Sequence, residues 1–189
     1  MDDVTGFLIR LLTRSPWSYL TWPAVAMVAG TVVGKTSARA ARALAVVPRT
    51  AAGSVGLFTA PFVHMNLAHL AANLPPFVVL GALVLRRGEA QFPSVVLSIA
   101  AGEGVLLWLL GRKAAHVGMS GVVFGLLGYL VALAGFTRAT PDLLAAGGVM
   151  LFYGGMLAGV APARKGTSWE GHLFGLIAGV GTAWFFHGR

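Results

Sequence analysis

The sequence predicts an all-α integral membrane protein with six transmembrane helices. Of its 189 residues, 57% are hydrophobic and only 11% are charged, whereas charged residues make up about one quarter of a soluble domain. The mean hydropathy is +0.79, and a soluble fold could not bury that much apolar surface. The apolar residues also fall into stretches of about 20 residues, the length a helix needs to cross a bilayer.

Six such stretches follow one another along the chain. The first connection is unusually long, because the basic, Ala-rich segment 36–50 follows the first stretch. Pro61 then divides a long uncharged run, so we expect re-entrant or interfacial structure before the second helix. The expected crossing helices are 17–34, 64–85, 92–111, 119–137, 143–160 and 171–186, within one membrane domain of residues 17–189.

Residues 1–16 form a separate N-terminal segment. Four apolar residues recur there at helical spacing, while Arg10 and Arg14 lie elsewhere on the helical wheel. The segment lacks the basic start and the small-residue cleavage site of a signal peptide. We therefore expect a short helix that lies in the membrane interface.

The charge and cysteine content narrow the possible partners. No cysteine is present, which excludes disulfides and thiolate metal sites. The formal charge of +8 would suggest nucleic acid in a soluble protein, but here Lys and Arg occur singly or in pairs between apolar stretches. Contact with anionic lipid headgroups is the better interpretation. We expect neither a nucleic-acid partner nor a cofactor.

Charge does not settle the orientation. With the N-terminus inside, the inner connections carry six Lys and Arg residues and the outer ones carry eight. The positive-inside rule therefore leans weakly against an inside N-terminus. Half of the outer residues come from the long first connection.

Polar residues inside apolar stretches are the candidates for function, because burying them in a membrane is costly. Glu103 is the single acid among them, and we expect it to face the protein and to be protonated. The full set is His64, Asn66, His69, Asn73, Ser98, Glu103, Ser120 and His172.

Ser120 and His172 form the candidate catalytic pair. Ser120 lies in Gly118-Met119-Ser120-Gly121, where a helix should begin and leave backbone N–H groups free. His172 stands at the start of the last helix, and a serine nucleophile needs a base within hydrogen-bond reach. The alternative interpretation is a serine in a packed helix and an ordinary interfacial histidine.

Two glycine stripes could bring this pair together. Gly121 and Gly125 lie on one face of the fourth helix, and Gly171, Gly175 and Gly179 recur every four residues in the sixth. Small residues at this spacing let helix backbones approach closely in lipid. We expect the two stripes to face each other.

The neighbouring Leu176 is expected to point away from the glycine stripe. No acid is placed to orient His172, since Glu170 should point elsewhere on the helix. The sequence thus predicts a dyad whose imidazole is positioned by aromatic packing.

His69 and Asn73 lie four residues apart, so both side chains can point to one place on a helix. Two such donors could stabilise an oxyanion. The alternative is a polar pair that joins helices. A metal site at His64, His69 and His172 is possible by ligand type, but it would leave Ser120 unexplained.

Together these motifs resemble the rhomboid family, in its short bacterial six-helix form. The resemblance runs from about residue 47 to the C-terminus. It rests on Phe58-Thr59-Ala60-Pro61-Phe62-Val63-His64, His69-x-x-x-Asn73, Gly118-Met119-Ser120-Gly121 and Trp169-Glu170-Gly171-His172-Leu173-Phe174-Gly175.

The resemblance implies a six-helix bundle and an intramembrane serine protease. Ser120 and His172 would be the dyad, His69, Asn73 and the Ser120 amide would stabilise the oxyanion, and His64 would support the site. Phe124 stands where a tyrosine often stacks on the histidine. The implied substrates are single-span membrane proteins. The resemblance also implies a bacterial cell membrane as the location, with the active site opening toward the outside.

Two other functions remain open. A catalytically silent relative could bind membrane clients without cutting them. A small transporter could use Glu103 and the histidines as a polar path, although no inverted repeat supports it.

Overall fold

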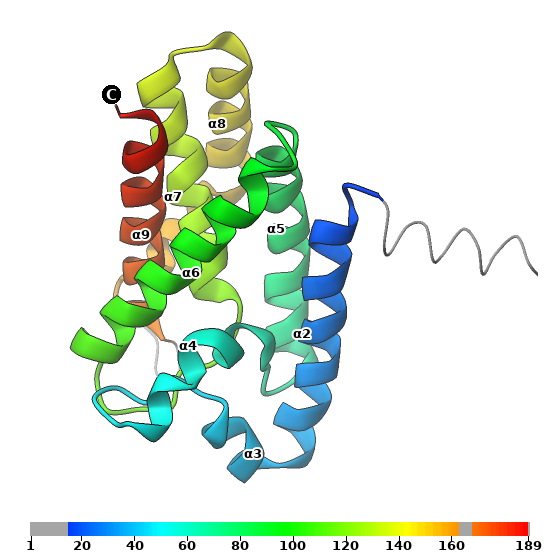
Figure 1. The fold of residues 1–189 in the computed structure, drawn as a ribbon, viewed down its shortest axis with the longest axis vertical. Coiled ribbons are helices and arrows are strands. Elements are labelled where there is room, and N and C mark those ends of the chain that lie inside the picture. The colour runs from blue at the N-terminus through cyan, green and yellow to red at the C-terminus, as the bar shows by residue number, and fades with distance from the viewer. Residues whose placement is uncertain (1–14, 163–167, 189) are drawn as a thin grey trace, which may run out of the picture.

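The computed structural model describes residues 15–162 and 168–188, and this part of the chain is all α apart from one isolated β-bridge. The interfacial helix expected within residues 1–16 lies almost wholly outside the described residues. Figure 1 shows the long helices running roughly along one axis, with α3 and α4 gathered at one end. That end is also where α7 and α9 begin.

The elements follow the predicted order closely. In chain order they are α2 (Ser18–Thr36), α3 (Ala38–Ala43), η1 (Ala52–Ser54), α4 (Gly56–Thr59), η2 (Ala60–Phe62), α5 (Leu67–Leu85), α6 (Gln91–Leu110), α7 (Ser120–Thr137), α8 (Thr140–Tyr153), η3 (Gly154–Val160) and α9 (Trp169–His187).

Four stretches of the described chain are long and apolar enough to cross a membrane. They are α5, α6, α7 and the continuous stretch of α8 and η3. This identifies an integral membrane protein. The helices α2 and α9 each have 19 residues, a suitable length, but their mean hydropathy is lower than that of these four stretches.

Two predicted boundaries were wrong. The second long helix begins at Leu67 rather than residue 64, because Asn66 caps it by accepting a hydrogen bond from the His69 amide at 2.7 Å. The fifth begins earlier than predicted, at Thr140, with Pro141 in its first turn. It then tightens into the 3₁₀ segment η3.

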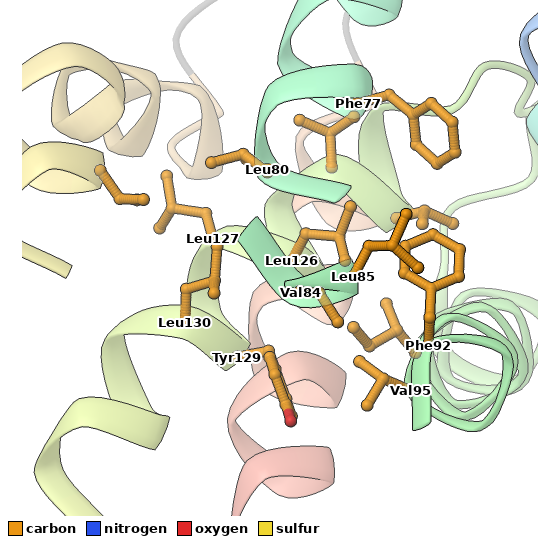
Figure 2. Close-up of a cluster of buried hydrophobic side chains, with 14 of the residues drawn as sticks. Phe77, Leu80, Val84, Leu85, Phe92, Val95, Leu126, Leu127, Tyr129 and Leu130 are labelled. Atoms are coloured by element: carbon orange, nitrogen blue, oxygen red, sulfur yellow. The ribbon is translucent and has the colours of Figure 1, made fainter. Parts of the chain in front are cut away.

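Helix α7 is the centre of the bundle. Apolar residues surround it on all sides, as in a helix buried by its neighbours, and it contacts α5, α6, α8 and α9. Figure 2 shows side chains from α5, α6 and α7 meeting in the core, including Phe77, Val95 and Leu126. These three side chains are completely buried.

Helices α7 and α9 pack through their backbones. A Cβ atom added at Gly175 would overlap the carbonyl oxygen of Gly121, and one at Gly179 would overlap that of Gly125. The expectation that the two glycine stripes face each other is confirmed. Leu176 does not point away from α7 as expected, because it lies against Gly128 and packs on the core.

We expect Gly175→Ala to destabilise the protein, since the new methyl group meets main-chain atoms that cannot rotate aside. Overpacking of this kind typically costs about 1–3 kcal/mol. The melting temperature in detergent should fall. Gly181→Ala on the same helix is the control, because a Cβ there meets nothing within 4 Å. Equal melting temperatures for the two variants would contradict the close packing.

Candidate active site

Ser120 is the first residue of α7 and follows a loop that needs glycine. Gly118 has a φ of +112°, and a Cβ there would lie only 2.6 Å from His69 Nε2. The Gly118 amide donates to the Ala60 carbonyl at 2.9 Å. The Ser120 amide belongs to the first turn, whose N–H groups have no acceptor within the helix and can stabilise negative charge.

The structure brings Ser120 and His172 together. Nε2 of His172 lies 3.0 Å from Ser120 Oγ, and Nδ1 lies 3.0 Å from the Gly159 carbonyl oxygen in η3. A carbonyl only accepts, so Nδ1 carries the ring proton and Nε2 is the acceptor. The Ser120 hydroxyl therefore donates to Nε2. This is the tautomer in which a histidine can act as a general base.

The ring of Phe124 stacks on His172. The ring centroids are 4.2 Å apart and the planes differ by 6°. The predicted aromatic packing against the imidazole is thus present, but the Gly159 carbonyl was not foreseen. A backbone acceptor has no side-chain signature, and residue 159 is ten or more residues from every quoted motif.

His64 supports the loop before Ser120. It is fully buried, its Nδ1 lies 3.3 Å from the Phe62 carbonyl, and its Nε2 accepts from the Met119 amide at 3.4 Å. It lies just before α5, and burial, aided by the neighbouring His69, lowers the pKa of His64 to about 4. The ring is therefore a neutral acceptor that helps to fix the loop.

His69 and Asn73 occupy successive turns of α5. The His69 ring lies over Gly118 and meets the His64 ring edge-on at 4.9 Å. Asn73 is buried, and its side-chain amide donates to the His69 carbonyl at 2.8 Å. The structure thus places His69 beside the serine loop. Asn73 is tied to the His69 backbone, which leaves its second N–H for another acceptor.

Glycine makes room for Glu103 beside the pair. Added Cβ atoms at Gly121 and Gly171 would lie 2.5 Å and 3.4 Å from Glu103 Oε1. The carboxyl is buried, as expected for a protein-facing acid. Glu103 and Ser120 both line a cavity of about 20 Å³, which is enough for one water molecule.

The remaining acid near the pair serves another contact. Glu170 forms an ion pair with Arg112 at 2.8 Å, so it does not orient His172. Within the described residues, no group of three or more His, Asp or Glu side chains could hold a metal ion. The histidines of the alternative metal site, His64 and His172, use both ring nitrogens in the contacts above.

Comparison with known proteins gives relatives in mycobacteria and a giant virus. The chain is 38% identical over 139 residues to "Uncharacterized protein ML1171" of Mycobacterium leprae, covering 68% of this chain and 55% of that protein. It is 36% identical over 143 residues to "Uncharacterized protein Rv1337" of Mycobacterium tuberculosis, covering 70% and 59%. It is 33% identical over 125 residues to "Putative rhomboid protein L523" of Acanthamoeba polyphaga mimivirus, covering 62% and 67%.

The matched region spans a little over half the length of the mycobacterial relatives. Residues 52–189 match the rhomboid domain. This range includes the serine loop, the histidine helix and the His69-x-x-x-Asn73 motif. Because the match covers well over half of the chain, the protein belongs to the rhomboid family.

Proposed function

We propose that this rhomboid is an intramembrane serine endopeptidase with Ser120 as nucleophile and His172 as general base. The observation that carries the proposal is the 3.0 Å contact between Ser120 Oγ and the unprotonated Nε2 of His172. A carbonyl on the opposite ring nitrogen holds that tautomer. A protein that only binds clients has no need of a base aligned on a hydroxyl.

In the proposed reaction Ser120 Oγ attacks the scissile carbonyl while His172 Nε2 takes its proton. The imidazolium keeps its hydrogen bond to Gly159, and the facing Phe124 ring stabilises the positive charge. The proton then passes to the leaving amine. A water molecule, deprotonated in turn by His172, hydrolyses the acyl-enzyme and restores the serine.

The oxyanion is proposed to form where the Ser120 amide and the His69 ring meet. Support comes from the position of His69 over Gly118 and from the start of α7 at Ser120. Asn73 would add its second N–H. Donors aimed at developing charge act in the transition state and hardly at all on substrate binding.

The proposed setting is a bacterial cell membrane that six helices cross, the four apolar spans together with α2 and α9. The dyad lies towards the end where α7 and α9 begin (Figure 1), and we propose that this end opens outward. The substrates would be single-span membrane proteins, cut near a small residue where their helix unwinds. Basic residues in the connections would contact lipid headgroups.

We expect Ser120→Ala and His172→Ala each to abolish cleavage of a model single-span substrate in proteoliposomes. Loss of a nucleophile or its base can cost about 10⁶-fold in kcat. Labelling of Ser120 by a fluorophosphonate should also disappear, while the melting temperature stays near that of the wild type. Ser98→Ala, an exposed serine on α6, is the control. A folded wild-type protein that neither cuts nor labels would instead be a client-binding relative.

His69→Ala and Asn73→Ala should lower kcat by about 10²–10³-fold, the usual loss for one oxyanion donor. KM should change little, because the donors act on charge that develops during the reaction. Steady-state kinetics on the same substrate separate the two constants. If KM rises while kcat is constant, these residues bind substrate or support the fold.

Gly159→Ala should slow acylation of Ser120, because the new Cβ would lie 3.1 Å from His172 Nδ1 and 3.0 Å from Phe124 Cζ. The imidazole must then shift, and a displacement of about 1 Å can cost about 10²-fold in rate. The measurement is the rate of fluorophosphonate labelling. Gly155→Ala in the same segment meets nothing within 4 Å and should label at the wild-type rate. Similar labelling rates for both variants would contradict the role of the Gly159 carbonyl in positioning the His172 ring.

A further inference from the structure

A second histidine–serine pair lies beside the pair of Ser120 and His172. In the first pair the serine belongs to α7 and the histidine to α9, whereas in the second the histidine precedes α7 and the serine precedes α9. Nδ1 of His116, in the loop before α7, lies 2.6 Å from Oγ of Ser168, just before α9. His116 precedes Ser120 by four residues, and Ser168 precedes His172 by four. The cavity next to Ser120 is lined by His116 and Ser168 as well. Two neighbouring hydrogen bonds therefore join the start of α7 to the start of α9.

The direction of the second hydrogen bond follows from its surroundings. Nε2 of His116 lies 3.1 Å from the Arg112 carbonyl oxygen, which only accepts, so Nε2 carries the proton. Burial lowers the pKa of His116, and the ring is neutral with Nδ1 free to accept. The Ser168 hydroxyl therefore donates to His116.

Ser168 is not used in the way that its position suggests. A serine before the first turn of a helix ordinarily accepts a hydrogen bond from an amide two or three residues ahead. Ser168 makes no such side-chain cap, and its hydroxyl binds His116 instead. Its backbone carbonyl accepts the His172 amide at 3.2 Å. One residue thus connects the His116 ring directly to the backbone of the proposed base.

Two further contacts make this connection rigid. Arg112 and Glu170 form an ion pair between the same two segments, and the Glu170 side chain is only 6% exposed. The backbone of His116 exchanges hydrogen bonds with Val46 of the first connection, at 2.9 Å and 3.0 Å. The loop is fixed on one side by Val46 and holds the start of α9 on the other.

We propose that His116 and Ser168 are positioning residues that hold His172 at hydrogen-bond distance from Ser120. The inference rests on the proposed protease function. Neither residue touches the reacting atoms; they act through the start of α9. Their loss should let His172 shift, and a shift of about 1 Å can cost about 10²-fold in rate.

The first test is single-turnover labelling of Ser120 by a fluorophosphonate in Ser168→Ala, Ser168→Thr and His116→Phe. The phenyl ring keeps a planar aromatic side chain at the buried position of His116, with a somewhat larger volume, but removes both hydrogen bonds. We expect Ser168→Ala and His116→Phe to label about 10–100-fold more slowly, to the same final extent as the wild type. Ser168→Thr keeps the hydroxyl and should restore most of the rate.

His187→Ala is the matched control. His187 Nε2 lies 3.1 Å from the Tyr129 hydroxyl, so it joins the last residue of α9 to the middle of α7, away from Ser120 and His172. Its loss should leave the labelling rate unchanged. An equal loss of rate in His187→Ala overturns the proposal. So does a lower final extent of labelling at an unchanged rate constant in Ser168→Ala and His116→Phe, because that result marks a purely structural role.

A second measurement does not depend on activity. The chain has no cysteine, so spin labels can be placed on cysteines introduced at the exposed positions Ala115 and Ile177. The distance distribution should be narrow in the wild type and broader in Ser168→Ala. No broadening overturns the proposal. The two proposals can also fail separately. If the distance distribution broadens in Ser168→Ala but the wild-type protein never reacts with the fluorophosphonate, the protease function is refuted and the positioning role stands.

Discussion

The close approach of α7 and α9 is the constraint on which the site depends. Gly175 packs on the backbone of Gly121, and Gly179 on that of Gly125. Lipid gives no hydrophobic drive for helices to associate, so small residues and backbone contact set their separation. Ser120 begins one of these helices and His172 lies near the start of the other. The separation of the backbones therefore sets the 3.0 Å distance between the two side chains.

Between the packed helices α7 and α9, the orientation of the His172 imidazole is set by groups without formal charge. Phe124 covers one face of the ring, and the Gly159 carbonyl holds Nδ1. A carboxylate in that place would put a charge at the end of an apolar span, where burying it costs free energy. A carbonyl fixes the same tautomer without that cost. The seven-residue 3₁₀ segment η3, longer than most, presents this carbonyl.

The features that the sequence made predictable have a periodic or a compositional signal. Long apolar stretches located the long helices to within a few residues, and the repeated glycines predicted the contact of α7 with α9. Polar residues in apolar surroundings singled out Ser120 and His172. The Gly159 carbonyl and the His116–Ser168 pair were missed, because one is a backbone group and the other lies in connections. The equal spacing of four residues, from His116 to Ser120 and from Ser168 to His172, was the signal that could have found the pair.

Polar contacts hold α9 at both of its ends, and between them its glycines pack against the backbone of α7. At the end of α9 away from His172, His187 contacts Tyr129 and also lies 3.2 Å from the Gln91 side-chain amide of α6. At the other end, Ser168 and Glu170 tie α9 to the loop before α7. A helix held only along its glycine stripe could still turn about its own axis, since glycine offers no side chain to resist it. Rotation of α9 would carry His172 away from Ser120, and the contacts at its two ends oppose that motion.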